Sequence, residues 1–238
     1  KMAPDQPHFQ DFFKDKNQLD QYDYFVFNSH WNYEQFRKTF SIPQERCTVI
    51  KNGIPNIKQR NVEEKKNKIK LIYHPTPWRG LSVLLGAMQL IKNPNVELDV
   101  YSSTKVYGSD FEKQNDDQYK ALYDQAKVLP NVNYIGYKSN KYILDNLHTY
   151  DAFVYPNIWE ETFCISALEA LACGLSVVTT DNGALYETCS EFPIYIPMDT
   201  NYKNLALQFA AVIDDLPHQI NDLGFQYHLK FQQKFYNH

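Results

Sequence analysis

The stretch that decides the fold is Glu161-Thr-Phe-Cys-Ile-Ser-Ala-Leu-Glu169-Ala-Leu-Ala-Cys-Gly174. The five residues 152–156, Ala-Phe-Val-Tyr-Pro, have the pattern of a buried strand that a proline ends. Residues 176–180 are rich in β-branched side chains, which favour a second strand. The stretch therefore predicts a strand, a loop, a helix and a strand, with Glu161 in the loop and Glu169 in the first turns of the helix.

The start of this helix suits a phosphate, and the two glutamates suit hydroxyl groups. A helix start carries free N–H groups and partial positive charge. Glu161 and Glu169 would repel a phosphate, but they can accept hydrogen bonds from a ribose on one side of it and a sugar on the other. Alternatively, Glu161 caps the helix and Glu169 is solvated. Because Glu169 lies among alanines and leucines, it needs a polar partner if it is buried.

Composition excludes several other classes of protein. The 238 residues are 43 % hydrophobic, which is enough for a full core, and the net charge of −4 argues against nucleic-acid binding. No apolar run reaches the length of a membrane span, and no signal peptide is visible. The scattered cysteines predict reduced side chains in a cytoplasmic protein, without a zinc site or other metal; they are Cys47, Cys164, Cys173 and Cys189.

The first part of the chain predicts a short α/β unit. A helix is expected over residues 8–17, a strand over 22–28, a helix over 30–40 that Ser29 caps, and a strand over 47–51. The following segment, residues 54–68, is rich in lysine and polar side chains and is interpreted as a solvated linker or loop. We therefore divide the chain into domains at residues 1–57 and 58–238.

The second part alternates strands and helices regularly, which predicts a Rossmann-like parallel sheet with helices on both faces. Ligands of such sheets bind at the carboxyl ends of the strands. Strands are expected at 69–73, 96–101, 132–135, 151–156, 175–180 and 193–197. Helices are expected at 80–91, 116–128, 138–148, 164–173, 201–214 and 217–236. A short helix is also expected after the turn at Asn182-Gly183, and it ends near Cys189. The loops at the carboxyl ends are 74–79, 101–110, 136–138, 157–164 and 181–183.

Loop 74–79, His-Pro-Thr-Pro-Trp-Arg, places Arg79 at a helix start on this ligand face. Gly80 allows the backbone to come close, and Arg79 could bind a diphosphate through charge-assisted hydrogen bonds. The alternative is a surface arginine paired with a nearby carboxylate. His74 and His148 are interpreted as structural. Cys164 could be a nucleophile at a helix start, but donation from its backbone N–H is the preferred interpretation.

The stretch from Glu161 to Gly174, with the Leu-Ser-Val-Val that follows it, resembles the Glu-x7-Glu signature of retaining glycosyltransferases of the GT-B fold, in family GT4. No glycine-rich dinucleotide loop, P-loop or Asp-x-Asp motif competes with it. Other segments agree with this family in the same order along the chain: Asp23 to Ser29, Cys47 to Ile54, Thr76 to Leu81, Val132 to Gly136, Tyr150 to Pro156 and Thr180 to Gly183.

The resemblance implies roles for single residues. Arg79 and Glu161 would be catalytic: Arg79 would stabilise the departing nucleotide diphosphate, and Glu161 would bind hydroxyls of the donor sugar. Glu169 would hold the ribose hydroxyls. Main-chain N–H groups after Glu161 would contact the sugar and the diphosphate, and the loop after the 132–135 strand would touch the base. The implied donor-binding residues are Arg79, Tyr137, Lys138, Glu161, Thr162, Phe163, Cys164, Ile165 and Glu169.

The chain also departs from the family pattern. Thr162 and Cys164 stand where the family often has the two glycines of Glu-Gly-Phe-Gly, so the loop is less permissive. His74 stands where the family commonly has a second basic residue, five before Arg79. Residues 1–57 hold only a remnant of the acceptor-side domain, so we expect a missing N-terminal domain of the same polypeptide as a partner.

These features together predict the donor-binding part of a glycosyltransferase. It would transfer a hexose from a UDP- or GDP-linked sugar to a glycan or other hydroxyl acceptor, with retention and without a metal or other cofactor. The alternatives are a nucleotide-sugar epimerase or phosphorylase on the same fold, and a non-catalytic nucleotide-sugar-binding module. Little or no transfer is expected from this chain alone, for want of an acceptor domain.

Overall fold

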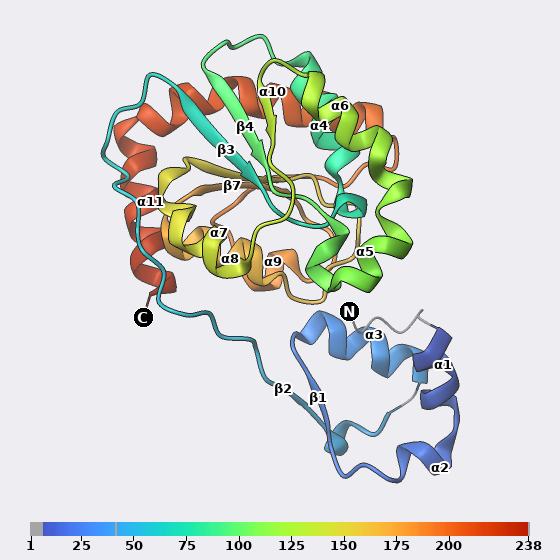
Figure 1. The fold of residues 1–238 in the computed structure, drawn as a ribbon. Helices are drawn as coiled ribbons and strands as arrows, with labels where there is room; N and C mark the ends of the chain where they lie inside the picture. Colours follow the sequence, from blue (N-terminus) through green and yellow to red (C-terminus); the bar gives the residue numbers. More distant parts are fainter. Residues whose placement is uncertain (1–6, 41, 238) are drawn as a thin grey trace.

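A six-stranded parallel sheet forms the centre of the larger part of the chain (Figure 1). The computed structural model describes residues 7–40 and 42–237. The strands lie in the order β5-β4-β3-β6-β7-β8. Their bounds are β3 (Ile69–Tyr73), β4 (Val96–Val100), β5 (Val132–Tyr134), β6 (Ala152–Tyr155), β7 (Ser176–Thr180) and β8 (Ile194–Ile196). All five neighbouring pairs are parallel, so the predicted α/β class with a Rossmann-like sheet is confirmed.

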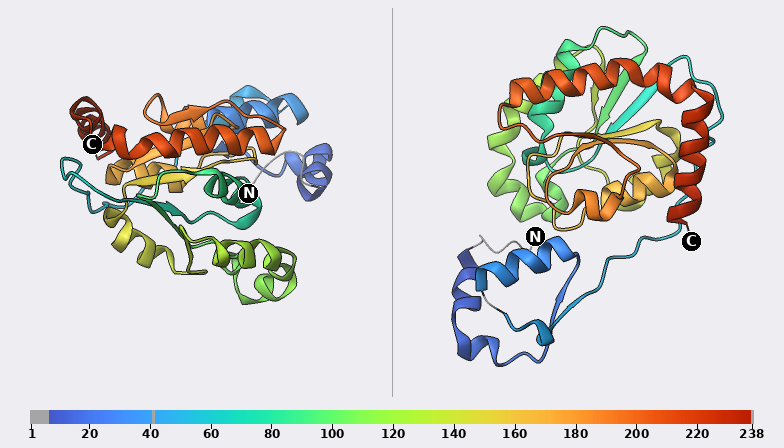
Figure 2. Two further views of the ribbon diagram at one scale, coloured as in Figure 1. Left: turned by 90° about the horizontal axis from the view of Figure 1, so that it is seen from above. Right: turned by 180° about the vertical axis from the view of Figure 1, so that it is seen from behind.

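Helices cover both faces of this sheet (Figures 1 and 2). One face carries α4 (Leu81–Leu90), α6 (Lys120–Val128) and α10 (Tyr202–Asn221). The other carries α7 (Asn140–Asn146), α8 (Ile165–Cys173) and α9 (Leu185–Cys189), and α11 (Leu223–Tyr236) packs against α8. Helix α5 (Ser109–Asn115) lies beyond the carboxyl end of β4.

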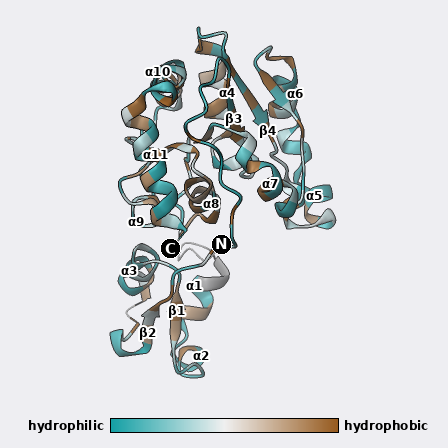
Figure 3. Cartoon of the chain, turned by 90° about the vertical axis from the view of Figure 1, so that its left-hand side faces the viewer, coloured by the Kyte–Doolittle hydropathy of each residue, from teal (hydrophilic) through white to brown (hydrophobic). Residues whose placement is uncertain are grey.

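The core lies between the sheet and these helices. Every residue of β6 and β7 is buried, and so is most of α8, including Ala167 and Leu171. Figure 3 colours α8 and the inner strands hydrophobic and much of the outer helical surface hydrophilic. Phe153 and Leu85 are fully buried, and burial of such a side chain contributes about 2 kcal/mol. The body of α8 from Glu169 to Cys173 is therefore packed into this core, whereas its first residue, Ile165, is exposed.

A smaller unit precedes the sheet (blue in Figure 1). It contains α1 (Pro7–Lys14), α2 (Lys16–Leu19), β1 (Phe25–Phe27), α3 (His30–Phe40) and β2 (Cys47–Val49). Strand β1 pairs with β2 in parallel, and Phe27, Phe36 and Ile42 form its buried cluster. The predicted cap of α3 is confirmed, because Ser29 Oγ accepts a hydrogen bond from the N–H of Asn32 at 3.0 Å.

The segment interpreted as a solvated linker is partly buried. Arg60 and Val62 are only 5 % and 3 % exposed. Arg60 forms an ion pair of 2.8 Å with Asp151, and its N–H donates to Cys173 O at 3.0 Å. The interpretation is therefore wrong for the middle of the segment, where Arg60 pairs with a buried carboxylate, whereas residues 63–68 are largely exposed as predicted. The boundary between residues 57 and 58 stays a prediction.

Several predicted helices have different bounds. The break between the two closing helices falls at Asp222, whose side chain accepts from the N–H of Phe225 and begins α11, whereas Pro217 lies inside α10. Loop 101–110 gives way to the unexpected α5, and α6 begins at Lys120. The first helix divides at Asp15, whose carboxylate caps α2. Side-chain caps thus fix the starts of α2 and α11, whereas α5 and α6 begin without one.

No helix in the part of the chain that the structure describes is long and apolar enough to span a membrane.

Candidate functional site

The site lies where the order of the sheet reverses. Strand β3 is followed along the chain by β4 on one side, and β6 joins β3 on the other side. A ligand crevice forms outside the carboxyl ends of the strands at such a switch point. The loops after β3 and β6 approach each other closely here, because a Cβ at Gly80 would stand 1.8 Å from Pro156 O. Gly80 also has a φ of +120°, so the predicted need for glycine is confirmed.

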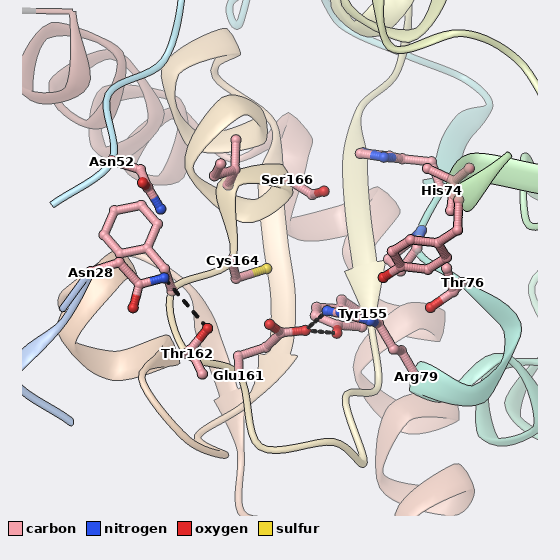
Figure 4. A pocket seen from close by; sticks show the side chains of 15 residues that line it. Asn28, Asn52, His74, Thr76, Arg79, Tyr155, Glu161, Thr162, Cys164 and Ser166 are labelled. Carbon is pink, nitrogen blue, oxygen red and sulfur yellow. Dashed lines mark hydrogen bonds and ion pairs between the residues drawn. The ribbon is translucent and has the colours of Figure 1, made fainter. Parts of the chain in front are cut away.

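Arg79, Glu161 and Tyr155 converge in this crevice (Figure 4). The Arg79 guanidinium pairs with Glu161 Oε1, and the Tyr155 hydroxyl donates to the same oxygen at 2.6 Å. The side chains of Arg79 and Glu161 are only 16 % and 4 % exposed. Burial alone would lower the pKa of Arg79, but the carboxylate beside it raises that pKa above its usual range. The two residues that the sequence proposed as catalytic thus form one buried ion pair.

The backbone of Glu161 is fixed from the neighbouring loop. Glu161 forms an isolated parallel bridge with Gly183, and Glu161 O accepts from the N–H of Ala184 at 2.7 Å. A Cβ at Gly183 would stand 2.4 Å from Glu161 N, and Gly183 has a φ of +70°. The residue before α8 is Cys164, whose side chain makes no capping hydrogen bond. The Glu161 carboxylate lines the crevice, where it pairs with Arg79.

The N-terminus of helix α8 lies at the same crevice. It begins at Ile165, and Cys164 before it adopts the left-handed conformation with a φ of 72°. The first N–H groups of a helix have no partner within it. A pocket of about 320 Å³ is lined by Arg79, Tyr155, Glu161 and Thr162 together with Phe163, Cys164, Ile165 and Ser166. Six of the nine predicted donor-binding residues thus lie around one pocket.

Cys164 has no sign of an activated thiol. Burial raises its pKa well above the usual range, and the nearby Glu161 carboxylate adds to this effect. A thiolate is the nucleophilic form, and a raised pKa keeps Cys164 as the unreactive thiol at neutral pH. The four cysteines are free thiols in the structure.

Glu169 lies outside the lining of this pocket. It is 3 % exposed on the second turn of α8. Burial raises its pKa to about 7, and a hydrogen bond with Asn140 at the start of α7 lowers it in part. The predicted polar partner of Glu169 is therefore an amide, without a cation. A carboxyl of this kind can accept hydrogen bonds from hydroxyl groups of a ligand that reaches it.

The predicted base contacts lie on the loop after β5, also outside the pocket. Tyr137 is 42 % exposed. Lys105 Nζ lies 5.7 Å from the centre of its ring, and Lys138 Nζ lies 5.4 Å from the ring of Tyr142. Tyr137 and Lys138 are exposed and come just before Asn140, the first residue of α7, whose side chain bonds Glu169. The structure thus divides the predicted residues into a pocket group and a group around α7.

Sequence reasoning missed several residues of the pocket. Tyr155 read as a buried strand residue, and Asn28 and Asn52 belong to the smaller unit, yet all three line the pocket. His74 lines it too, and burial lowers its pKa to about 4. It is therefore a neutral imidazole at pH 7 and does not replace a second cation. The pattern that could have found Tyr155 is its place as the last residue of β6, at the carboxyl end of a central strand.

Hydrogen bonds join the smaller unit to the rim of the pocket. Ser29 Oγ donates to Thr162 O at 2.7 Å. The Glu187 carboxylate accepts from the N–H groups of His30 and Trp31, both at 2.9 Å, at the start of α3. Lys51 Nζ lies 3.6 Å from the same carboxylate. The loop that carries Glu161 and Thr162 is therefore held from both sides.

Comparisons with known proteins agree with this geometry. Residues 54–221 match the family described as "Glycosyl transferases group 1". A lipopolysaccharide 1,2-N-acetylglucosaminetransferase of Salmonella typhimurium is 24 % identical over 173 residues, which cover 64 % of this chain and 44 % of that protein. The chain thus spans less than half the length of this curated relative.

Solved structures share the fold. The pneumococcal O-GlcNAc transferase GtfA, in complex with UDP and GlcNAc, superposes with a TM-score of 0.70 at 15 % identity, over 97 % of this chain and 44 % of that one. The Anabaena protein HepE, in complex with UDP and glucose, gives a TM-score of 0.68 at 19 % identity, over 92 % of this chain and 60 % of that one. At these identities the likeness concerns the GT-B fold.

Proposed function

This chain belongs to the group 1 glycosyl transferases, and from that premise we propose that it is the donor-binding part of a retaining, metal-independent glycosyltransferase of family GT4. The donor would be a UDP- or GDP-linked hexose, and the acceptor a hydroxyl group of a glycan or another molecule. The observation that carries this proposal is the convergence of Arg79 and Glu161 in one pocket at the opening of α8. Arg79 and the N–H groups at the start of α8 can bind a diphosphate, and the Glu161 carboxylate can accept hydrogen bonds from the hydroxyl groups of a sugar.

The two groups of predicted residues suggest how the donor would lie. Its diphosphate would bind Arg79 and the N–H groups of residues 163–165, with the sugar at Glu161. The ribose would reach Glu169, and the base would reach Tyr137 and Lys138 at the start of α7. Complexes of structural relatives with UDP and a sugar support a donor of this class.

Arg79 and Glu161 would divide the chemistry of transfer. As the bond between the sugar and the diphosphate breaks, negative charge grows on the leaving oxygen. Arg79 and the helix start would stabilise that charge. The acceptor hydroxyl would attack from the face that the diphosphate leaves, which gives retention, while Glu161 holds the sugar in place. The acceptor would be held by a further domain, for which the greater length of the curated relative leaves room.

A thermal-shift screen of UDP-, GDP- and ADP-sugars tests donor binding. We expect one base to raise the melting temperature, and Arg79→Ala to remove that rise. Arg37→Ala is the matched control, because Arg37 pairs with Glu34 on the surface of α3, outside the residues that line the pocket. A chain that none of these nucleotide sugars stabilises would contradict the proposal. Conversion of a nucleotide sugar without any acceptor would favour an epimerase instead.

A further inference from the structure

Tyr155 stands out among the pocket residues, because its hydroxyl serves both members of the ion pair. It is the last residue of β6 and is fully buried. Its hydroxyl donates to Glu161 Oε1 at 2.6 Å and is itself bonded by the Arg79 guanidinium. Figure 4 shows the three side chains meeting at the base of the pocket. A phenylalanine would fill the same core position, so packing alone does not account for the hydroxyl.

The hydroxyl is a permanent donor in this place. Burial raises the pKa of Tyr155 well above its usual range, and the charge of Glu161 adds to this effect. The phenol therefore stays protonated at any physiological pH. A neutral donor of fixed position holds a carboxylate without neutralising it. Glu161 thus keeps a hydrogen-bond partner that does not depend on Arg79.

Donor binding would change the partners of Glu161. A diphosphate competes with the carboxylate for the Arg79 guanidinium, since both are anions that bind arginine through the same N–H groups. Once Arg79 turns to the diphosphate, the carboxylate loses part of its countercharge and one contact to Oε1. Unless something else fixes it, the side chain of Glu161 would gain rotamer freedom and no longer point at the sugar.

We propose that Tyr155 is a positioning residue, which holds Glu161 Oε1 toward the donor sugar while Arg79 engages the diphosphate. The inference rests on the proposed function of this pocket. In the proposed arrangement the diphosphate would bind Arg79 and the N–H groups of residues 163–165, and the base would bind Tyr137 and Lys138, so Tyr155 would contact neither. Its loss should therefore weaken recognition of the sugar and leave recognition of the nucleotide nearly intact.

The inference is tested by calorimetric titration of the full chain with a nucleoside diphosphate and with the matching nucleotide sugar. The first pair of ligands is UDP and UDP-glucose, and the second is GDP and GDP-mannose. Tyr155→Phe should weaken binding of the nucleotide sugar roughly tenfold, the value of one hydrogen bond to a charged group. Binding of the free diphosphate should change less than about twofold. Tyr150→Phe is the matched control, because Tyr150 is equally buried and donates to the Asp99 carboxylate at 2.7 Å, with neither residue lining the pocket.

A second variant separates positioning from a structural role. In a Glu161→Ala background, Tyr155→Phe should have no further effect on nucleotide-sugar affinity, because the side-chain oxygen that the hydroxyl holds is gone. Equal losses for diphosphate and nucleotide sugar in Tyr155→Phe would overturn the inference, and so would an unchanged affinity for both. If the wild-type chain binds neither pair, the proposed function itself fails, and this inference falls with it.

Discussion

Glu161 and Glu169 belong to one short stretch and are equally buried, at 3 % exposure each, yet their surroundings are opposite. Glu161 lies in the loop before α8, with the Arg79 guanidinium and the Tyr155 hydroxyl on one of its oxygens. Glu169 lies within α8, and its polar partner is the neutral amide of Asn140. Glu161 thus has a buried cation beside it, whereas the pKa of Glu169 is set mainly by burial.

The difference teaches what each carboxylate can do. A carboxylate that is paired with a fixed cation stays in place. When it binds a ligand through its oxygens, its ion pair with that cation must partly open. A carboxylate without one is easily protonated, and hydroxyl donors from a ligand would favour its charged form. We therefore assign the sugar to the first and the ribose to the second. The following variants test whether the two surroundings differ as described.

Removing the cation should have the largest effect. Arg79→Ala leaves the Glu161 carboxylate buried without its countercharge, and we expect a loss of about 3 kcal/mol in the free energy of unfolding. The double variant Arg79→Ala with Glu161→Gln should recover about half of that loss, because no buried charge then remains. Urea unfolding at pH 7 measures both values.

The surface variant Arg37→Ala serves as the control and should leave the free energy of unfolding nearly unchanged. A double variant that is as unstable as Arg79→Ala would show that the charge of Glu161 is not the source of the loss.

The pH dependence of stability should distinguish the glutamates next. The pKa of Glu169 is about 7 in the folded chain, above its ordinary value of 4.5. The folded state therefore binds this proton more tightly, and the stability it contributes is complete below pH 4.5 and is lost as the pH rises through about 7. Glu169→Gln does not titrate. It should gain on the order of 1 to 3 kcal/mol relative to wild type between these two pH values.

Glu161→Gln gives the matching comparison at pH 8. It breaks an ion pair and should destabilise the chain, whereas Glu169→Gln should stabilise it. Urea unfolding over the pH range measures all three proteins. The same sign for both substitutions would mean that the two surroundings are alike, which would remove the basis for assigning different roles.

Much of this arrangement could be predicted from the sequence, because it depends on short-range patterns. The alternation around residues 69–180 specified the sheet, and the stretch from Glu161 to Gly174 specified where α8 begins. Arg79 was also predicted on the ligand face, since it ends a proline-rich loop after a strand. The sequence offered a surface pairing with a nearby carboxylate as the alternative to diphosphate binding by Arg79, but it did not identify Glu161 as that carboxylate.

Other features depend on contacts between distant segments, which no local pattern encodes. Tyr155 has the sequence pattern of a core strand residue. The role of its hydroxyl becomes visible only in the folded chain, where it bonds Glu161. Asn28 and Asn52 come from the smaller unit, which reaches the pocket through Ser29 and Glu187. The predicted break between Asp214 and Pro217 lies instead at Asp222, where a side-chain cap begins α11.

The smallest expected effect concerns Cys164, the residue that separates the surroundings of the two glutamates. Its φ of 72° ends the loop of Glu161 and allows α8 to begin at Ile165. A side chain in this left-handed region costs about 1 kcal/mol relative to glycine.

Cys164→Gly and Cys164→Ala both remove the thiol, and they differ in the Cβ alone. Glycine should therefore be the more stable variant by about 1 kcal/mol, against the usual preference for alanine at helix starts. Thermal unfolding of the two variants side by side measures this difference. Greater stability of the alanine variant would show that the turn between Glu161 and Glu169 is unstrained, and that another contact sets the two glutamates apart.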